Sequence, residues 1–192
     1  MFKKYARIVY NNNRVFSIKW RNNRVEIERK FLVKMLPNNL EKYEKHEVTQ
    51  AYICTDPVIR CRKSGEKYYL TIKSSGLLKR EEHEFMITKD QFNNLLKKSE
   101  GNIICKTRYK IPEKDGLTIE LDIFHGIFEG LIYAEVEFPT EDKAKKYNPP
   151  AFIGREVTGD GSYQNSSLSR MDKSLILDFI SNIRTCTDTD KS

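Results

Sequence analysis

The stretch VEIERKFLV at residues 25–33 alternates charged and apolar residues and includes three β-branched ones, a pattern that predicts an extended strand. Alternate side chains of a strand point to opposite faces, so Glu26, Glu28 and Lys30 share one face and the apolar residues share the other. Two carboxylates about 7 Å apart along a strand repel each other unless positive charge lies between them, and a divalent cation held by oxygen ligands would supply it. A solvated charged face on a half-buried antiparallel strand is the alternative.

Charged residues two positions apart recur in nearly every later strand-like segment. They are Arg60/Arg62, Arg80/Glu82/Glu84, Lys106/Arg108/Lys110, Glu120/Asp122 and Glu135/Glu137, with Lys73 alone in its segment. An ordinary sandwich would bury the apolar faces of these strands and leave the charges in water. A closed eight-stranded barrel can instead direct the apolar residues outward, under covering helices, and the charges inward around a lumen.

Seven further strand-like segments, separated by turn signals, follow the opening strand. They span 48–54, 58–62, 67–73, 79–87, 103–111, 117–124 and 131–138. Helices are predicted over 40–45, 88–98, 140–147 and 167–183, the second with a capping box formed by Thr88 and Gln91. The apolar side of the last helix would consist of Leu168, Met171, Leu175, Leu177, Phe179 and Ile180. The predicted fold is α+β but mainly β: a closed eight-stranded antiparallel barrel, or tunnel, with a charged lumen and a few covering helices.

The positive charge of the chain is concentrated at its N-terminus. The 192 residues include 34 Lys and Arg against 27 Asp and Glu, for a formal net charge of +7. Residues 1–24 hold seven of the basic residues and no acidic one, so 25–192 keeps 27 of each sign. The overall charge therefore does not predict a nucleic-acid partner.

Cysteine spacing and hydropathy limit the cellular setting. Cys54, Cys61, Cys105 and Cys186 form no C-x-x-C pair and match no zinc or disulfide framework, so we expect free thiols in a reducing cytoplasm. No apolar run approaches the length of a membrane span, and the N-terminus lacks the apolar stretch of a signal peptide. Neither a membrane partner nor export is predicted.

Three parts of the chain are expected: a basic N-terminal extension at 1–24, one domain at 25–185 and a flexible tail at 186–192. The extension has three competing interpretations, namely a flexible tail, an added strand pair, or a segment that is not normally made. The last has a specific motivation. Val25 can be encoded by an alternative bacterial start codon, and Trp20-Arg21 by a sequence that resembles a ribosome-binding site.

A charged lumen indicates a class of ligand. Inward arginines and lysines would neutralise a chain of phosphates, the arginines through bidentate contacts. Several carboxylates would hold one or two metal ions that bridge phosphate oxygens and activate water. Neither set is stable inside a barrel without the other or the ligand, because buried unpaired charge is costly. The combination indicates hydrolysis or transfer on a polyphosphate, with a charged-surface binding module as the alternative.

Several blocks of residues resemble a known family. The Glu26-to-Lys30 segment resembles the E-x-E-x-K signature of CYTH domains, also called triphosphate tunnel metalloenzymes. Further similar blocks occur in family order at 50–53, 59–62, 69–73, 79–84, 106–109, 120–122, 134–138 and 154–160. The resemblance covers roughly 25–185 and implies an antiparallel eight-stranded tunnel that binds triphosphates and needs Mg²⁺ or Mn²⁺.

The resemblance also implies roles for individual residues. The metal ligands would be Glu26, Glu28, Glu135 and Glu137, with Asp122 and Glu120 assisting a second metal or the water. The phosphate clamp would consist of Lys30, Arg60, Arg62, Lys73 and Arg108, with Arg80 and Lys106 as weaker members or as internal salt bridges. Tyr52 would hydrogen-bond to phosphate or water, or stack on a base. Arg155 and Tyr163 would close one tunnel mouth, and Gln164 replaces a lysine that some relatives have.

The resemblance implies a metal-dependent hydrolase of small-molecule triphosphates that acts without a nucleic-acid or membrane partner, as a monomer or homodimer. Family members hydrolyse inorganic triphosphate, thiamine triphosphate or RNA 5′-triphosphates, and some are adenylate cyclases. Val58 offers no aromatic platform beside Arg60, and Trp20 lies outside the similar region. Inorganic tripolyphosphate, cut to pyrophosphate and phosphate, is therefore the preferred substrate. The alternatives are an adenylate cyclase, a nucleoside or thiamine triphosphatase, and a non-catalytic polyphosphate-binding module.

A shortened chain tests the interpretation of the N-terminal extension. A protein that begins with Met followed by Glu26 should fold and hydrolyse tripolyphosphate as well as the full chain, since residues 1–24 contain none of the site residues. Its isoelectric point should fall toward neutrality, because seven cationic groups are lost and no acidic one. Phosphate release and isoelectric focusing measure both effects. An insoluble or inactive short protein would make 1–24 an integral part of the fold.

Overall fold

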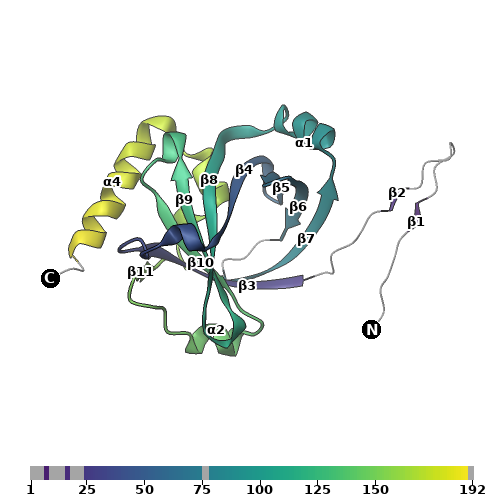
Figure 1. Cartoon of the computed structure of the whole chain (residues 1–192). Helices are drawn as coiled ribbons and strands as arrows, with labels where there is room; N and C mark the ends of the chain where they lie inside the picture. The colour runs from purple at the N-terminus through teal and green to yellow at the C-terminus, as the bar shows by residue number, and fades with distance from the viewer. Residues whose placement is uncertain (1–6, 9–15, 18–23, 75–77, 190–192) are drawn as a thin grey trace.

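Eight consecutive antiparallel strands form a closed barrel in the computed structural model, which describes residues 7–8, 16–17, 24–74 and 78–189. Within these ranges the barrel strands are β3 (Arg24–Val33), β4 (Glu44–Thr55), β5 (Val58–Ser64), β6 (Lys67–Lys73), β7 (Lys79–Ile87), β8 (Glu100–Pro112), β9 (Thr118–His125) and β10 (Ile132–Glu137). Their order is β10-β9-β8-β4-β5-β6-β7-β3, and β10 pairs back onto β3 to close the ring (Figure 1). The predicted eight-stranded barrel is confirmed.

Two further pieces of sheet lie outside the eight barrel strands. The first was not predicted, and the second corresponds to the added strand pair that is one interpretation of the extension. The strand β11 (Ile153–Glu156) pairs with β3 and lies outside the barrel order. The short β1 (Arg7–Ile8) and β2 (Phe16–Ser17) pair with each other. The rest of the predicted extension up to residue 23, and residues 190–192 of the predicted tail, lie outside the described residues.

Capping residues start α1 and α2, two of the helices that lie against the barrel. The predicted capping box is present at α1 (Lys89–Leu96), where Thr88 and Gln91 exchange side-chain to backbone bonds. The Thr140 hydroxyl accepts a bond from the Lys143 amide at the start of α2 (Glu141–Lys146). The helix predicted over 40–45 is only a 3₁₀ turn, η1 (Leu40–Lys42), because β4 already begins at Glu44. Three more 3₁₀ turns are η2 (Lys114–Gly116), η3 (Gly126–Phe128) and η4 (Gly161–Tyr163).

The single helix predicted over 167–183 is wrong, because two helices occupy this region: α3 (Asn165–Arg170) and α4 (Lys173–Thr189). Met171 has an extended ψ of 133°, and the Asp172 carboxylate accepts bonds from the amide and hydroxyl of Ser174 at 2.9 and 2.8 Å, which starts the second helix. The break changes the buried face. Ile176, Ile180 and Ile183 pack inward, whereas Leu175 and Leu177, predicted to be on the apolar side, are 57% and 73% exposed.

Among the described residues, the two largest of three apolar clusters support the barrel from different sides. The first lies on the outward faces of β3, β9 and β10 under α2, and it includes Phe31, Leu121 and Val136. The second, here called the end cluster, contains the inward-facing residues that follow the charged rows at one end of the strands, joined by residues of α3 and α4. Its members are Leu32, Tyr52, Ile104, Phe124, Phe128, Leu131, Tyr133, Val157, Tyr163, Leu168, Ile176, Ile180 and Ile183. The end cluster therefore gives the charged lumen an apolar floor.

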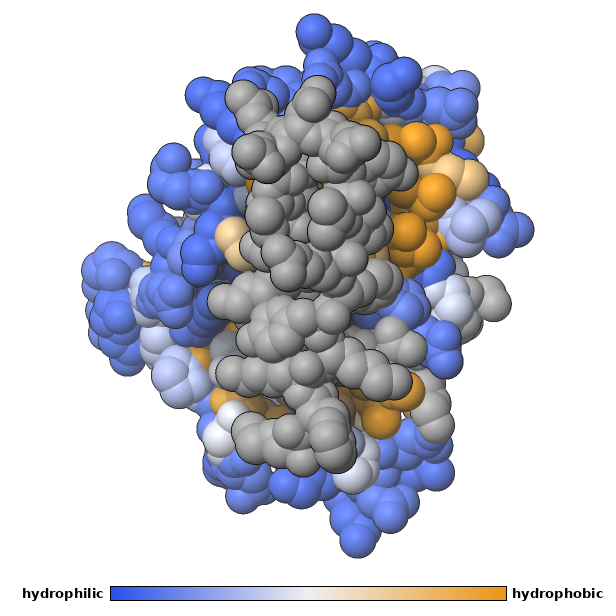
Figure 2. Space-filling model, turned by 90° about the vertical axis from the view of Figure 1, so that its right-hand side faces the viewer, coloured by the Kyte–Doolittle hydropathy of each residue, from blue (hydrophilic) through white to orange (hydrophobic). Residues whose placement is uncertain are grey.

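The surface of the described residues is mostly hydrophilic on the face that Figure 2 shows, with hydrophobic residues visible in smaller areas. The helix α4 contacts η3 and β3, and Figure 1 shows it on the opposite side of the barrel from α1. None of the described helices is long and apolar enough to cross a membrane.

Gly101 lets β8 approach α3 closely, and its replacement tests that contact. Its φ is +73°, and a Cβ atom there would overlap the backbone oxygen of Ser169. Gly101→Ala should lower the free energy of unfolding by about 3 kcal/mol, from the left-handed backbone and the overlap together. Gly116→Ala is the control, since Gly116 has φ +71° and open space around it, and it should cost only about 1 kcal/mol. Denaturant unfolding measures the free energy of unfolding of both variants. Equal losses of stability would mean that the close contact between Gly101 and α3 does not add to stability.

Candidate active site

The inward faces of the barrel strands line a cavity of about 620 Å³, a volume within the range of small-molecule sites. Twelve of the fourteen predicted site residues line it: Glu26, Glu28, Lys30, Tyr52, Arg60, Arg62, Lys73, Lys106, Arg108, Glu120, Glu135 and Glu137. Asp122 is fully buried behind this wall. The backbone of Arg80 pairs with Glu26, but its side chain lies outside the described part of the chain.

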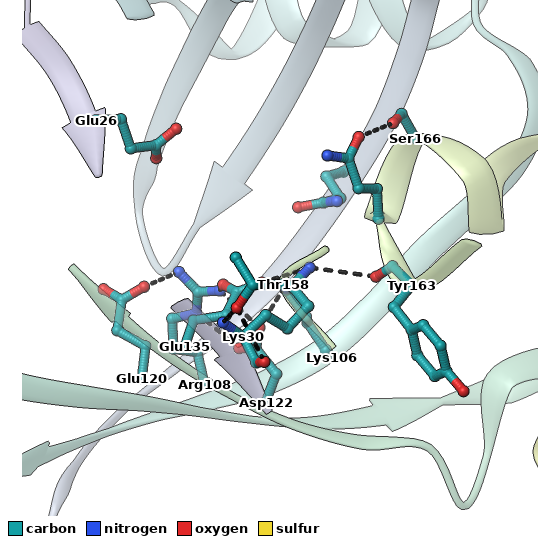
Figure 3. Close-up of polar contacts among 12 residues, drawn as sticks. Glu26, Lys30, Lys106, Arg108, Glu120, Asp122, Glu135, Thr158, Tyr163 and Ser166 are labelled. Atoms are coloured by element: carbon teal, nitrogen blue, oxygen red, sulfur yellow. Dashed lines mark hydrogen bonds and ion pairs between the residues drawn. The ribbon is translucent and has the colours of Figure 1, made fainter. Parts of the chain in front are cut away.

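Arg108 is the centre of one group of charges in the lumen. Its guanidinium donates to both oxygens of Asp122 at 2.6 Å, to Glu135 at 2.6 Å and to Glu120 (Figure 3). Burial alone would lower the pKa of Arg108, but the charges of Asp122 and Glu120 outweigh it and hold the pKa well above its ordinary value. Arg108 is thus a permanent cation fixed by three strands.

Two lysines complete this group. The Lys106 ammonium is 1% exposed and lies 2.5 Å from Asp122, and burial lowers the pKa of Lys106 despite that partner. The Lys30 ammonium lies 2.9 Å from Glu135 and donates to the backbone oxygen of Tyr163 at 3.2 Å. Lys30 therefore connects β10 with the segment that precedes α3 (Figure 3).

A second group of charges lies on β5, β6 and β7. Arg62 pairs with Glu84 at 2.5 Å, and Arg60 donates to the hydroxyl of Thr71 at 3.2 Å. Lys73 donates to Glu26 at 2.7 Å. The Nε–H groups of Arg60 and Arg62 are buried and have no acceptor among the described residues. Both arginines can thus offer a donor to a ligand.

Lys73 has a second carboxylate partner on β7. Its ammonium lies 2.5 Å from Glu82 Oε2, a close ion pair. The lysine is therefore held between β3 and β7, with one acidic residue from each strand.

The carboxylates of the lumen differ sharply in their environments. Burial, followed by the negative charges of Glu135 and Glu26, raises the pKa of Glu28 to about 7. Burial would also raise the pKa of Glu135, but Lys30 and Arg108 hold it well below its ordinary value. Electrostatic repulsion is therefore concentrated at Glu28, where positive charge would be most stabilising.

The carboxylate oxygens are the kind of ligand that a divalent metal prefers, but they do not converge on one point in this structure. No three acidic, histidine or cysteine side chains converge in a metal-binding arrangement among the described residues. Glu26 and Glu135 are each held by cationic side chains. The oxygen donors and the raised pKa of Glu28 fit a hard cation that would replace those side-chain partners.

Comparison with known proteins gives the family. The CYTH domain profile matches residues 24–173. The chain belongs to the CYTH domain family. An inorganic triphosphatase of Nitrosomonas europaea is 42% identical over 149 residues, which is 75% of this chain and 96% of the relative. An inorganic triphosphatase of Acetivibrio thermocellus is 38% identical over 146 residues, or 74% and 92%.

A solved structure agrees with this assignment. The crystal structure of an inorganic triphosphatase is similar with a TM-score of 0.59 and 38% identity, covering 77% of this chain and 95% of that chain. Metal dependence is general for the CYTH family. All fourteen predicted site residues lie within the span that the CYTH profile matches.

Several residues that line the CYTH lumen are absent from the predicted site. Gln50 lies on an inward strand face two positions from Tyr52, so the period of two is a signal that could have identified it. Glu82 and Glu84 were predicted to belong to an inward charged row but were given no role in the site. Thr158, Asp160 and Gln164 come from a segment with no regular strand, and Asn165 and Ser166 from the first turn of α3, so no strand periodicity assigns them a face. Tyr163 and Arg155, predicted to close a mouth, are bonded to each other at 2.8 Å.

Glu28→Gln tests the repulsion within the lumen. Between the ordinary pKa of 4.5 and about 7, the folded protein keeps a proton on Glu28 that the unfolded chain has released, so its stability falls as pH rises through this window. Gln cannot ionise. At pH 8 in EDTA the variant should be more stable than wild type by roughly 1–3 kcal/mol, and the gain should disappear near pH 4.5.

Thermal or denaturant unfolding across pH measures this difference. Glu81→Gln is a matched control on an exposed outward position of β7. If the extra stability of Glu28→Gln did not depend on pH, ionisation of Glu28 would not be its cause.

Proposed function

We propose that this protein is a metal-dependent triphosphatase that cleaves inorganic tripolyphosphate to pyrophosphate and phosphate. The observation that carries the proposal is the lumen of the closed barrel, which arginines and lysines line together with carboxylates. The similarity to inorganic triphosphatases over most of the chain supports it. Cationic side chains bind phosphate, and oxygen ligands bind the metal that phosphate requires.

The lumen favours an inorganic substrate over a nucleotide. The Tyr52 ring is 3% exposed and belongs to the end cluster, so it presents no face on which a base could stack. Its hydroxyl accepts a bond from Gln50 at 3.2 Å. Tyr52 would thus contribute at most a hydrogen bond to the substrate, and the neighbouring Val58 adds no aromatic surface.

The clamp residues would bind the phosphates and stabilise the charge that develops as the terminal bond breaks. Arg60 and Arg62 have unused Nε–H donors, and Lys30, Lys73 and Arg108 would supply further positive charge. Lys106, and Arg80 from β7, would be weaker members of this clamp. Because the lumen is walled by protein, these charges act in a low dielectric and are held in place before the substrate arrives.

Glu26, Glu28, Glu135 and Glu137 would hold Mg²⁺ or Mn²⁺. When bound, the cation would neutralise phosphate oxygens and polarise the terminal phosphoryl group. Asp122 bonds to Lys106 and Arg108 through its oxygens and is 0% exposed, so we assign it a positioning role in place of the predicted metal ligation. Glu120 lines the lumen beside Arg108 and would orient water.

The remaining aspects of the proposal concern the setting of the enzyme. The partner would be a small triphosphate and not a nucleic acid, since residues 25–192 carry equal numbers of acidic and basic groups. Cys54, Cys61 and Cys105 are free thiols, which fits a cytoplasmic protein. The protein would act as a monomer or a homodimer.

A phosphate-release panel tests the function. The full chain should release phosphate from tripolyphosphate with Mg²⁺ or Mn²⁺, faster than from ATP or thiamine triphosphate, and EDTA should abolish turnover. Glu28→Gln should fold yet lose turnover by at least about 100-fold, because one ligand of the metal is weakened. Glu81→Gln should match wild type.

The same panel can contradict the proposal in two ways. Faster release from ATP or thiamine triphosphate would assign a different substrate. If Glu28→Gln turned over at near the wild-type rate at saturating metal, Glu28 would not be a metal ligand.

A further inference from the structure

The strand β3 changes its neighbour part-way along one edge. β7 pairs with residues 24–27 of β3, and β11 pairs with residues 31–33 on the same side. Between these two pairings the Val157 amide donates to the backbone oxygen of Lys30 at 2.8 Å. Residues 153–163, here called the seam segment, therefore continue the wall of the barrel where β7 leaves it, and several of their side chains line the cavity.

The seam segment holds Lys30 by both its backbone and its side chain. The Lys30 amide donates to the hydroxyl oxygen of Thr158 at 2.9 Å, next to the bond that the Lys30 carbonyl accepts from Val157. The Lys30 ammonium donates to the backbone oxygen of Tyr163. Lys30 is 8% exposed and belongs to the proposed phosphate clamp. The place of this cation in the lumen therefore depends on where the seam segment lies.

Arg29 fixes the seam segment from outside the barrel. Its Nε and Nη2 atoms donate to the two carboxylate oxygens of Glu156 at 2.8 and 2.5 Å. Its Nη1 atom donates to the backbone oxygens of Ala144 and Tyr147 at the C-terminal end of α2, at 2.7 and 2.9 Å. The guanidinium carbon also lies 5.0 Å from the centre of the Phe31 ring. One rigid guanidinium thus joins β3, α2 and the seam segment.

Glu156 connects this outer contact with the lumen. Its Oε1 atom accepts from Arg29 and also from the Thr158 hydroxyl at 2.7 Å. Since the Thr158 hydroxyl donates to Glu156, its oxygen is oriented to accept the Lys30 amide. The hydrogen bond from Arg29, aided by the one from Thr158, outweighs burial and lowers the pKa of Glu156. A chain of hydrogen bonds therefore runs from the outer face of β3 through Glu156 and Thr158 to Lys30.

We propose that Arg29 and Glu156 are positioning residues that act through Thr158 to hold Lys30 in the phosphate clamp. Arg29 points outward between two inward residues of β3, and neither Arg29 nor Glu156 is among the described residues that line the cavity. The inference rests on the proposed function and adds to it a pair of residues outside the lumen. A lysine that is already held in place loses less conformational freedom when it binds phosphate, so it binds phosphate more tightly.

The charge of Glu156 gives the test a direction. Glu156→Met removes a negative charge near a site for polyanions, so a purely electrostatic effect would tighten the binding of tripolyphosphate. Loss of positioning would weaken this binding, because the Thr158 hydroxyl loses its acceptor and Arg29 loses its partner in the seam segment. The two explanations therefore predict changes of opposite sign.

The experiment is calorimetric titration of the full chain with tripolyphosphate in EDTA, which prevents hydrolysis. Glu156→Met should weaken binding by about tenfold, the lower end of what is lost when a residue that orients a metal ligand is changed. Thr158→Val interrupts the same chain of hydrogen bonds. The double variant should therefore lose about as much affinity as the more affected single variant, and not the product of the two losses.

Two controls separate positioning from general effects. Glu81→Gln removes a negative charge from an exposed outward position of β7 and should leave the affinity unchanged. Ile111→Val removes one methylene from the apolar cluster under α2, to which Phe31 and Tyr147 also belong. It should lower the midpoint of thermal unfolding without changing the affinity.

The outcomes separate the inference from the proposed function. Unchanged or tighter binding by Glu156→Met would overturn the inference, as would an equal loss of affinity in Ile111→Val or independent losses in the double variant. If wild type neither binds nor hydrolyses tripolyphosphate, the proposed function fails, and amide hydrogen exchange then decides the inference. Faster exchange of the Lys30 amide in Glu156→Met than in wild type would support it, and equal exchange would overturn it.

A second variant covers a failure of Glu156→Met to fold. Glu156→Gln keeps the shape and one acceptor oxygen, so it should weaken tripolyphosphate binding by a smaller factor and speed exchange of the Lys30 amide. Tighter or unchanged binding by Glu156→Gln would count against the inference in the same way.

Discussion

The balance of opposite charges within one lumen is the constraint on which the rest of this structure depends. Among the described residues, seven lysines and arginines and nine acidic residues line the same cavity. Buried charge is costly unless it is paired, and most of these cations lie within ion-pair distance of a carboxylate from another strand. Arg108, bonded to Glu120, Asp122 and Glu135, is the clearest case. Without these pairs the inward rows would repel each other and the barrel would not close.

The same pairs explain how a site can be assembled before its ligands bind. Several of the carboxylates that could hold a metal, such as Glu26 and Glu135, and cations that could hold phosphate, such as Lys73, already have their positions set by a partner of opposite sign. Lys73 between Glu26 and Glu82 shows this arrangement on one wall. Exchange of these internal partners for metal and phosphate keeps the charge balanced throughout, so binding need not expose an uncompensated charge to the interior.

The strand β3 and the C-terminal segment give the lumen its shape. β3 pairs with β7, β10 and β11 at once, which makes it the strand that closes the ring. The helices α3 and α4 complete the end cluster, and Asn102 donates to the backbone oxygens of Leu168 and Met171 to hold α3 against β8. The cavity is therefore closed at one end by apolar packing between strand residues of the barrel and residues from the last quarter of the chain.

The sequence by itself determined the strands, their inward and outward faces and most of the site, because alternation with a period of two is a local property that any extended segment such as 25–33 displays. Only the tertiary structure decided which charges pair, since contacts such as that of Lys30 with Tyr163 join residues 133 positions apart. It also decided the break at Met171, the strand β11, and the burial of Asp122 and Tyr52. Register, helix breaks and burial depend on which surfaces meet, and no short-range pattern in the chain records that.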